Sequence, residues 1–477
     1  MTRDSVPNSA SGAPVLLWLR RELRLADNPA LIAALATGRK VVPVFVLDEH
    51  SAGPWAPGAA SRWWLHQSLS ALGADLAARG AGLVLRRGRF EEEIPRLVAE
   101  TGAAEVHAGL PTEPWARAAY RKVAEAPGVK LRVHLTMLLF PPDAIRTQAG
   151  TPYGVFSPFA RACRALSPPG MAEAAPARIP AAAAVASDTL DSWGLLPRVP
   201  DWADGLRDSW TPGEAGAQAR LGEFVAGPLA AYRQRRDVPG EDSTSRLSPH
   251  LAWGEISPRQ VWHATAGCEK FRDEVLWREF AANLLWHNPT LPEAPLRENF
   301  AGMPWRDDPA GLRAFRRGRT GIPIIDAGMR QLWATGWMHN RVRMITASFL
   351  VKHLLIPWQA GEAWFWDTLV DADLAQNAAS WQWVAGCGAD AAPYFRIFNP
   401  VLQGRKFDAD GAYVRRWVPE LAELPDAVLH CPWEAPVLVL QQARVRLGTS
   451  YPHPVVGLAE GRNRALEAFA TLGKAAA

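Results

Sequence analysis

Residues 14–48, PVLLWLRRELRLADNPALIAALATGRKVVPVFVLD, decide how the first part of this chain should fold. Two apolar runs, at 15–19 and 41–48, lie on either side of a stretch with helical character. Strand-length apolar runs separated by a helix-length segment are typical of βαβ units. Because parallel strands need such a crossover, this stretch predicts a parallel sheet.

Three further apolar runs continue the pattern, namely GLVLRR at 82–87, AEVHAG at 104–109 and VKLRVHL at 129–135. We therefore predict a doubly wound α/β domain over residues 14–140, with helices on both faces and ligands at the carboxyl ends of its strands. The dinucleotide fingerprint G-x-G-x-x-G does not follow the first strand, where WLRRELRLADNPAL stands instead, so a nicotinamide cofactor is not expected here.

The rest of the chain changes character twice. Residues 141–213 are rich in Ala, Pro and Gly and include PARIPAAAAVASDTL at 176–190, which predicts an interdomain connector. From 214 to 472 the β-branched runs give way to amphipathic stretches rich in Trp, Leu, Ala and Arg, which predict an all-helical domain. The expected fold class is therefore α/β plus all-α.

Composition narrows the class of protein. The 477 residues exceed one ordinary core, and 48% hydrophobic with 21% charged residues is typical of soluble globular proteins. No apolar run reaches the roughly 18 to 20 residues that span a bilayer, and the polar start lacks a signal-peptide core, so we expect a cytoplasmic protein. Cys163, Cys268, Cys387 and Cys431 form no C-x-x-C pair, so neither a metal site nor a disulfide framework is expected. The net charge of +4 suits a polyanionic partner without requiring one.

Four strings resemble the photolyase/cryptochrome family: WLRRELRLADNPAL at 18–31, TSRLSPHLAWGEIS at 244–257, TGWMHNRVRMITASFLVKHLL at 335–355, and WDTLVDADLAQNAASWQWVAGCGADAAPYFRIFNP at 366–400. They span both predicted domains, and the chain is most similar to bacterial class I cyclobutane pyrimidine dimer photolyases. The resemblance implies a deoxyribodipyrimidine photolyase, a carbon–carbon lyase. Such an enzyme binds FAD and ultraviolet-damaged DNA and splits a flipped-out dimer with an electron from the excited, reduced flavin.

The hydroxyls and backbone amides of TSRLS at 244–248 stand just ahead of a predicted helix, where an anion is favoured, although an ordinary helix cap would explain them too. The resemblance implies that they cradle the FAD diphosphate. It also implies that Arg343 pairs with Asp371 and that Asn377 faces the reactive ring nitrogen of the flavin. Phe271 departs from the bacterial pattern, which has Trp there. By resemblance the FAD contacts are Tyr232, Thr244, Ser245, Arg246, Leu247, Ser248, Phe271, Arg278, Asn340, Arg343, Asp371, Asp373 and Asn377.

Phe271, Glu274, Trp277 and Arg278 are three or four residues apart and share one face of a helix. A carboxylate beside an indole suits an extruded base, although a surface Glu beside a core Trp would look the same. The basic runs at 233–236, 316–319 and 414–417 fit DNA phosphates or ordinary solvated faces. By resemblance the DNA contacts are Arg236, Glu274, Trp277, Asn340, Arg341 and Trp383, and the catalytic residues are Glu274, Asn340, Met344 and Asn377.

Asn340 and Met344 also bear on the substrate. Family members that act on the (6-4) photoproduct have histidines at these positions, as expected of a site that transfers a proton. Neither residue here is such a proton donor, which favours the cyclobutane dimer.

Trp381, Trp358 and Trp305 match the family's electron path, although core packing explains Trp358 and Trp305 equally well from sequence alone. Arg62 and Glu113 resemble positions that hold an antenna chromophore of the deazaflavin or flavin type. Ala116 stands where the folate type uses a glutamate, so the identity of the antenna stays open.

Two alternatives remain at this level: a cryptochrome-type blue-light photoreceptor without repair activity, and a flavoprotein that binds nucleic acid without photochemistry. Plant-type receptors carry Asp where Asn377 stands, and signalling members often extend well past the helical domain, whereas this sequence ends at Ala477. We expect a monomer that needs no protein partner and no membrane.

Overall fold

The N-terminal domain is a five-stranded parallel sheet in the order β3-β2-β1-β4-β5. The computed structural model describes residues 12–391 and 396–474. The strands are β1 (Val15–Leu19), β2 (Val41–Leu47), β3 (Val84–Arg87), β4 (Glu105–Gly109) and β5 (Leu131–His134). Each lies within one of the five predicted runs, and every pairing is parallel, so the predicted fold of this domain is confirmed.

Helices cover both faces of the sheet because side chains of a strand alternate between its faces. Val15, Leu17 and Leu19 of β1 pack in one apolar core with α1 (Pro29–Ala36) and α2 (Ala59–Ala78). Leu16 and Trp18 face the other core, against α3 (Phe90–Thr101) and α4 (Pro114–Glu125). Burial on both faces explains why the whole run of β1 is apolar.

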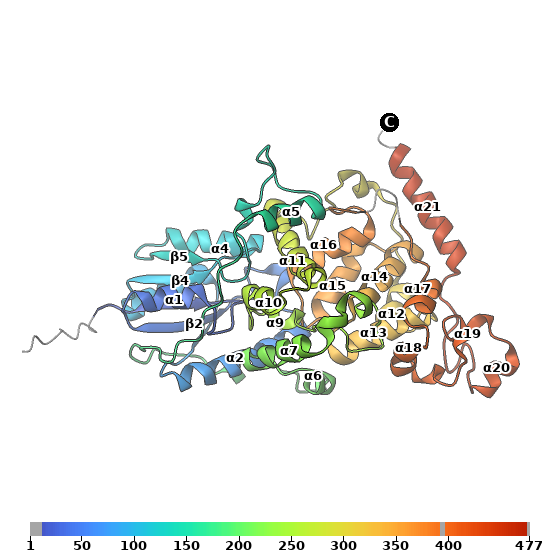
Figure 1. Ribbon diagram of the computed structural model, residues 1–477, viewed down its shortest axis with the longest axis horizontal. Helices are drawn as coiled ribbons and strands as arrows, with labels where there is room; N and C mark the ends of the chain where they lie inside the picture. The colour runs from blue at the N-terminus through green and yellow to red at the C-terminus, as the bar shows by residue number, and fades with distance from the viewer. Residues whose placement is uncertain (1–11, 392–395, 475–477) are drawn as a thin grey trace, which may run out of the picture.

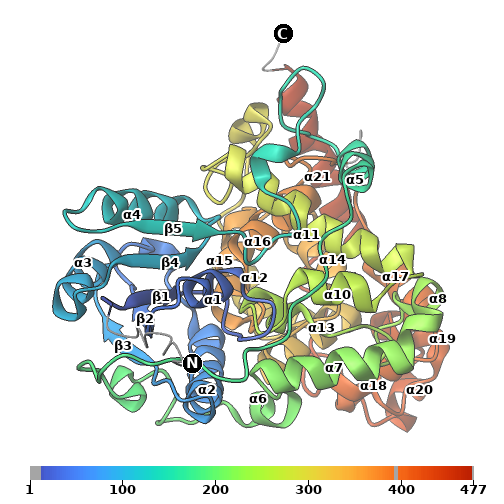
Figure 2. The ribbon, with the colours of Figure 1, turned by 60° about the vertical axis from the view of Figure 1, so that its left-hand side comes forward.

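Residues 141–213 are not irregular throughout, since they contain α5 (Phe156–Ala165) and α6 (Asp204–Ser209). Helix α5 packs on the helical domain, whereas the Ala- and Pro-rich stretch runs along the sheet (Figure 2). There the backbone N–H of Val41 donates to Pro180 O at 2.7 Å, and that of Asp188 donates to Leu85 O at 2.9 Å.

The C-terminal half is helical, as predicted. Its helices are α7 (Glu214–Ala226), α8 (Tyr232–Arg235), α9 (Ser248–Ala252), α10 (Pro258–Ala264), α11 (Glu269–His287), α12 (Pro309–Arg316), α13 (Pro323–Thr335), α14 (Asn340–Ser348), α15 (Trp358–Thr368), α16 (Leu374–Ala385), α17 (Pro400–Phe407), α18 (Ala412–Trp417), α19 (Asp426–Leu429), α20 (Val437–Gln442) and α21 (Leu458–Lys474). A π-helical turn (Phe349–His353) follows α14. Figure 1 shows this domain beside the sheet, with α19, α20 and α21 at the far end.

The two domains share an apolar core. Trp253, Trp337 and Val370 of the helical domain pack in the same cluster as β1 and α2. The carboxyl ends of β1 and β4 lead into Arg20 and Glu113, which line the interdomain boundary. The edge of the sheet where ligands are expected therefore faces the helical domain.

Candidate functional site

Helix α14 carries two arginines, each paired with an aspartate. Arg343 Nη2 donates to Asp371 Oδ2 at 2.7 Å, which confirms the predicted pair, and its Nε donates to Met338 O at 2.7 Å. Arg341 Nη2 donates to Asp237 Oδ2 at 2.8 Å. Residues two apart on a helix point to nearly opposite sides, so α14 presents one pair to each side.

The Asp371 side of α14 leads to helix α16. Asp373 caps α16, with its Oδ1 accepting from Gln376 N at 3.0 Å. One turn later, the buried Asn377 donates from Nδ2 to Glu362 O at 3.0 Å, which leaves its amide oxygen available as an acceptor. Both carboxyl oxygens of Glu362 are buried, with no hydrogen-bond partner in the described part of the chain. Burial raises the pKa of Glu362 to about 9, so this acid is uncharged at neutral pH.

The loop at 244–248 is held from α7. Arg220 donates to Thr244 O at 2.9 Å and to Ser245 O at 2.8 Å, and the Oγ of Ser248 accepts from Trp337 Nε1 at 3.1 Å. Arg246 has a φ of 51°, and its guanidinium lies 4.5 Å from the ring centroid of Trp210. Sequence reasoning missed Arg220, because an arginine on an amphipathic helix carries no signal for the loop that it will hold.

Two of the predicted flavin contacts are buried side by side. The rings of Tyr232 and Phe271 meet edge to face, with centroids 5.1 Å apart, and Phe224 packs on Phe271 at 4.7 Å. The phenylalanine that replaces the family's tryptophan at 271 therefore fills an aromatic cluster. Its contact with the flavin stays a prediction.

Helix α11 carries the half-buried Glu274 and Trp277, three residues apart. Glu274 forms ion pairs with Arg236 and, at 3.2 Å, with Lys270 Nζ. The ring of Trp277 stacks on Phe156 of α5, with centroids 3.8 Å apart and planes 7° from parallel. One face of the indole is thus covered from within the protein, and the stacking of a base on Trp277 stays a prediction.

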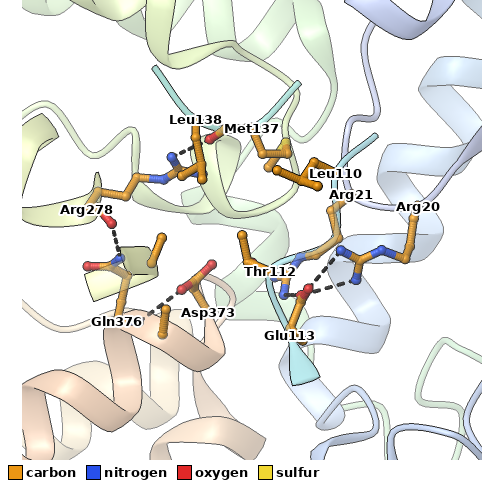
Figure 3. Close-up of a pocket in the computed structure, with 12 residues that line it drawn as sticks. Arg20, Arg21, Leu110, Thr112, Glu113, Met137, Leu138, Arg278, Asp373 and Gln376 are labelled. Atoms are coloured by element: carbon orange, nitrogen blue, oxygen red, sulfur yellow. Dashed lines mark hydrogen bonds and ion pairs between the residues drawn. The ribbon is translucent and has the colours of Figure 1, made fainter. Parts of the chain in front are cut away.

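Arg278, from the same helix, is directed elsewhere. It donates to Met137 O at 2.6 Å and lines a small interdomain pocket with Asp373 and Glu113 (Figure 3). Figure 3 shows Arg278 and Asp373 on one side of this pocket and the Arg20–Glu113 pair on the other. The predicted contacts of Arg278 and Asp373 with the flavin stay predictions.

Asn340 is exposed at the start of α14, and Met344 is half-buried one turn later. Before them, the buried His339 caps the helix, because its Nδ1 accepts from Arg341 N at 3.2 Å. Burial lowers the pKa of His339 to about 4, so this ring is neutral at neutral pH. Histidine is an uncommon N-cap, so sequence reasoning missed this role.

The predicted electron-path residues differ in exposure. Trp381 and Trp358 are each 2% exposed, whereas Trp305 is half-buried at the edge of the same core. Trp381 packs so closely on α15 that a Cβ added at Gly361 would lie 2.1 Å from its Cη2 atom. Trp383 points elsewhere and donates from Nε1 to Asp390 O at 3.1 Å, as its two-residue offset predicts.

The two predicted antenna residues have different partners. Glu113 accepts from Arg20 Nη2 at 2.8 Å and lines a second pocket of about 590 Å³ of open space at the carboxyl edge of the sheet. Burial alone would raise the pKa of Glu113, but Arg20 and Arg21 outweigh it and lower the pKa to about 2. Arg62 pairs with Glu49 and, among the described residues, is not part of that lining.

Buried polar atoms offer a test of whether these residues suit FAD. Asp371 Oδ1 and Arg246 Nε are buried and lack a hydrogen-bond partner within the described residues, as do both Glu362 oxygens. Such atoms are rare in native proteins, and a polar ligand between α9, α14 and α16 would satisfy them. Asp371, Arg246 and Glu362 therefore suit a bound FAD. No cluster of metal-ligating side chains is found among residues 12–391 and 396–474, and no helix there is long and apolar enough to cross a membrane.

Comparison with known proteins gives a consistent result over the whole chain. Residues 15–181 match the family model described as DNA photolyase, and residues 271–471 match the FAD binding domain of DNA photolyase. A deoxyribodipyrimidine photo-lyase of Agrobacterium fabrum is 49% identical, covering 98% of this chain and 99% of the relative. Cryptochrome-1 of Arabidopsis thaliana is 36% identical over 98% of this chain and 72% of its own length.

Among solved structures, a bacterial class III photolyase from Agrobacterium tumefaciens superposes with a TM-score of 0.94 at 48% identity, covering 99% of this chain and 100% of that one. The expected similarity to class I enzymes is therefore not confirmed. With both family models matched in order, the chain belongs to the DNA photolyase family and carries that family's FAD-binding domain.

Proposed function

We propose that this protein is a deoxyribodipyrimidine photolyase that repairs cyclobutane pyrimidine dimers in DNA under blue light. The observation that carries the proposal is the double pairing on α14. Arg343 pairs with Asp371, whose Oδ1 is buried without a hydrogen-bond partner among the described residues, and Arg341 pairs with Asp237, next to the Glu274–Arg236 pair. Flavin-side and DNA-side groups thus lie within one turn of one helix.

On the flavin side, the residues bind and orient. Asp371 Oδ1 and the amide oxygen of Asn377 are placed to accept hydrogen bonds, and Arg343 balances the carboxylate of Asp371. Bound, reduced FAD supplies, after absorbing blue light, the electron that reopens the cyclobutane ring. The neutral Glu362 adds no charge beside Asn377.

On the DNA side, Trp277 offers a stacking face and Glu274 a carboxylate for base edges, while Arg236 and Arg341 offer charge to phosphates. Neither Asn340 nor Met344 has an acidic side chain that could donate a proton to the substrate. The neighbouring His339 uses Nδ1 to cap α14. This supports the cyclobutane dimer over the (6-4) photoproduct as substrate, since the latter needs an acid.

The test is repair of two substrates by the FAD-loaded, reduced protein. Oligonucleotides carrying either a cyclobutane dimer or a (6-4) photoproduct are illuminated with blue light or kept dark, and remaining lesions are counted by chromatography. We expect only the cyclobutane dimer to disappear, and only in the light. Persistence of that dimer under illumination would refute the proposal and favour the cryptochrome-type alternative. That alternative is supported by the 36% identity to Cryptochrome-1.

The proposal includes three further expectations. The protein acts as a monomer, in the cytoplasm, and holds an antenna chromophore in the pocket beside Glu113. Trp55, Trp115, Trp253 and Trp366 in that lining support the last, because indoles stack on planar ring systems. Extraction and absorption spectroscopy of the purified protein would identify that chromophore.

A further inference from the structure

A row of alternating charges lines the DNA side of the candidate site. Lys270 Nζ lies 3.2 Å from Glu274 Oε1, and Glu274 pairs with Arg236. Arg236 Nε lies 3.8 Å from Asp237 Oδ1, and Asp237 Oδ2 accepts from Arg341 Nη2 at 2.8 Å. The row joins α11, the end of α8 and the start of α14.

Asp237 is the only member of this row that contacts both arginines expected at DNA phosphates. Its partner Arg341 is also held over the ring of Phe407, 4.5 Å from the centroid, and Arg341 Nη1 lies 3.8 Å from Met344 Sδ. With Asp237 in place, the guanidinium of Arg341 is held on three sides. Its side chain is 20% exposed and that of Arg236 is 13% exposed, so each side chain is partly accessible to solvent.

A carboxylate at this position is unfavourable for affinity. It repels phosphates and reduces the net positive charge that attracts DNA. An unrestrained arginine, however, loses rotamer entropy when it is fixed by a ligand. A group that holds two arginines in place before DNA binds lowers that entropy cost. It does so only for a DNA backbone whose geometry fits the two held side chains.

We propose that Asp237 is a positioning residue that orients Arg236 and Arg341 for the DNA backbone around a flipped-out dimer, and so determines discrimination between damaged and intact DNA. This rests on the proposed function. Asp237 weakens binding to DNA in general and strengthens the preference for the distorted site, because electrostatic complementarity contributes specificity more than affinity.

The experiment measures, in the dark, the dissociation constants of FAD-loaded protein for duplexes with and without one cyclobutane dimer. The variants are Asp237→Asn, Arg341→Lys, the double variant and Glu241→Gln. Glu241 is the matched control, because it is a nearby carboxylate paired with Arg235, outside the row. Lysine keeps the charge of Arg341 but loses the planar fork that Asp237 holds.

We expect Asp237→Asn to bind intact DNA as tightly as the wild type or more tightly, while its preference for damaged DNA falls roughly tenfold. Arg341→Lys should lose a similar factor. The preference of the double variant should also fall only about tenfold, as in each single variant, and not by the product of the two losses. The effects of coupled residues are not additive. Glu241→Gln should keep the wild-type preference.

Each other result has a definite reading. An unchanged preference in Asp237→Asn, an equal loss in Glu241→Gln, or a multiplicative loss in the double variant would overturn the positioning role. Melting curves and flavin absorption show whether each variant is folded and loaded. If Asp237→Asn does not fold or does not bind FAD, Arg341→Lys tests the proposal alone. A wild-type preference for damaged DNA in that variant would then overturn the proposal. A wild-type protein that does not prefer damaged DNA would contradict the proposed function, a different outcome from the others.

Discussion

Trp305 differs from the other two tryptophans of the predicted electron path by being half-buried, while Trp358 and Trp381 are 2% exposed. Trp305 is thus the most exposed of the three, and the predicted path for electrons from an external donor needs one member near solvent. We expect Trp305→Phe to slow light-driven reduction of the oxidised protein several-fold and to leave repair by chemically reduced protein unchanged. Flavin absorption under illumination measures the first and dimer counting the second. Loss of repair by the reduced variant would contradict this separation.

Glu362 allows a prediction about pH. Its pKa is about 9 in the folded protein against an ordinary value of 4.5, so between these values the folded state holds one proton more than the unfolded state. Stability is therefore lost as pH rises from about 4.5 toward 9, by at most about 1.4 kcal/mol per pH unit. Glu362→Gln removes this titration, so its melting temperature should exceed that of the wild type by more at pH 8 than at pH 5. A gap independent of pH would mean that Glu362 is ionised in the folded protein.

For single residues, the sequence predicted contacts between side chains that both lie in family motifs. It did not predict contacts of side chains outside those motifs. Arg343 and Asp371 lie in recognisable strings, and their pairing is confirmed. Asp237 and Glu362 carry no motif, because the partner of a charged side chain depends on which segments the fold brings together. Their roles follow only from the neighbours that the structure shows.

Among the elements, the strands were the most predictable and α5 the least. Five apolar runs of strand length leave little choice, whereas α5 is a short helix in a region rich in Ala, Pro and Gly. The connector composition concealed it. Its importance comes from one contact, the stack of Phe156 on Trp277, which no local pattern reports.

That stack makes α5 part of the candidate DNA site. Phe156→Ala should leave Trp277 free to tilt and lower the affinity for dimer-containing DNA by about 2- to 12-fold, the equivalent of the roughly 0.5–1.5 kcal/mol of an aromatic pair. Titration in the dark measures this. Phe156→Tyr is the matched control, since it keeps the stacking ring. Equal affinities in all three proteins would show that Trp277 needs no support from α5.

For the whole molecule, the fold class followed from the sequence because β-branched runs stop where the helical patterns begin. The junction between the domains did not, because polar residues hold it as well as apolar ones. Arg24 is fully buried and donates to Asp27 O at 2.8 Å, Thr136 O at 2.7 Å and Gly254 O at 3.0 Å. Burial lowers the pKa of Arg24 to about 10, so it stays charged at neutral pH. A buried arginine that donates mainly to backbone carbonyls would not be expected from sequence.

Arg24 therefore tests whether the two domains unfold together. Multidomain proteins often unfold in steps, but here one apolar core and this guanidinium span the boundary, so we expect one calorimetric transition for the wild type. Arg24→Met fills similar space and leaves the carbonyls of Asp27, Thr136 and Gly254 without their donor, at a cost of about 3–5 kcal/mol. Because that loss falls on the junction, the transition should split in two, with one step at a lower temperature. Arg39→Met is the matched control, and it should melt as the wild type does. Among the described residues, the Arg39 side chain donates to Ala13 O at 2.9 Å, and this hydrogen bond is exposed to solvent. A single, uniformly lowered transition in Arg24→Met would instead mean that the shared apolar core alone couples the domains.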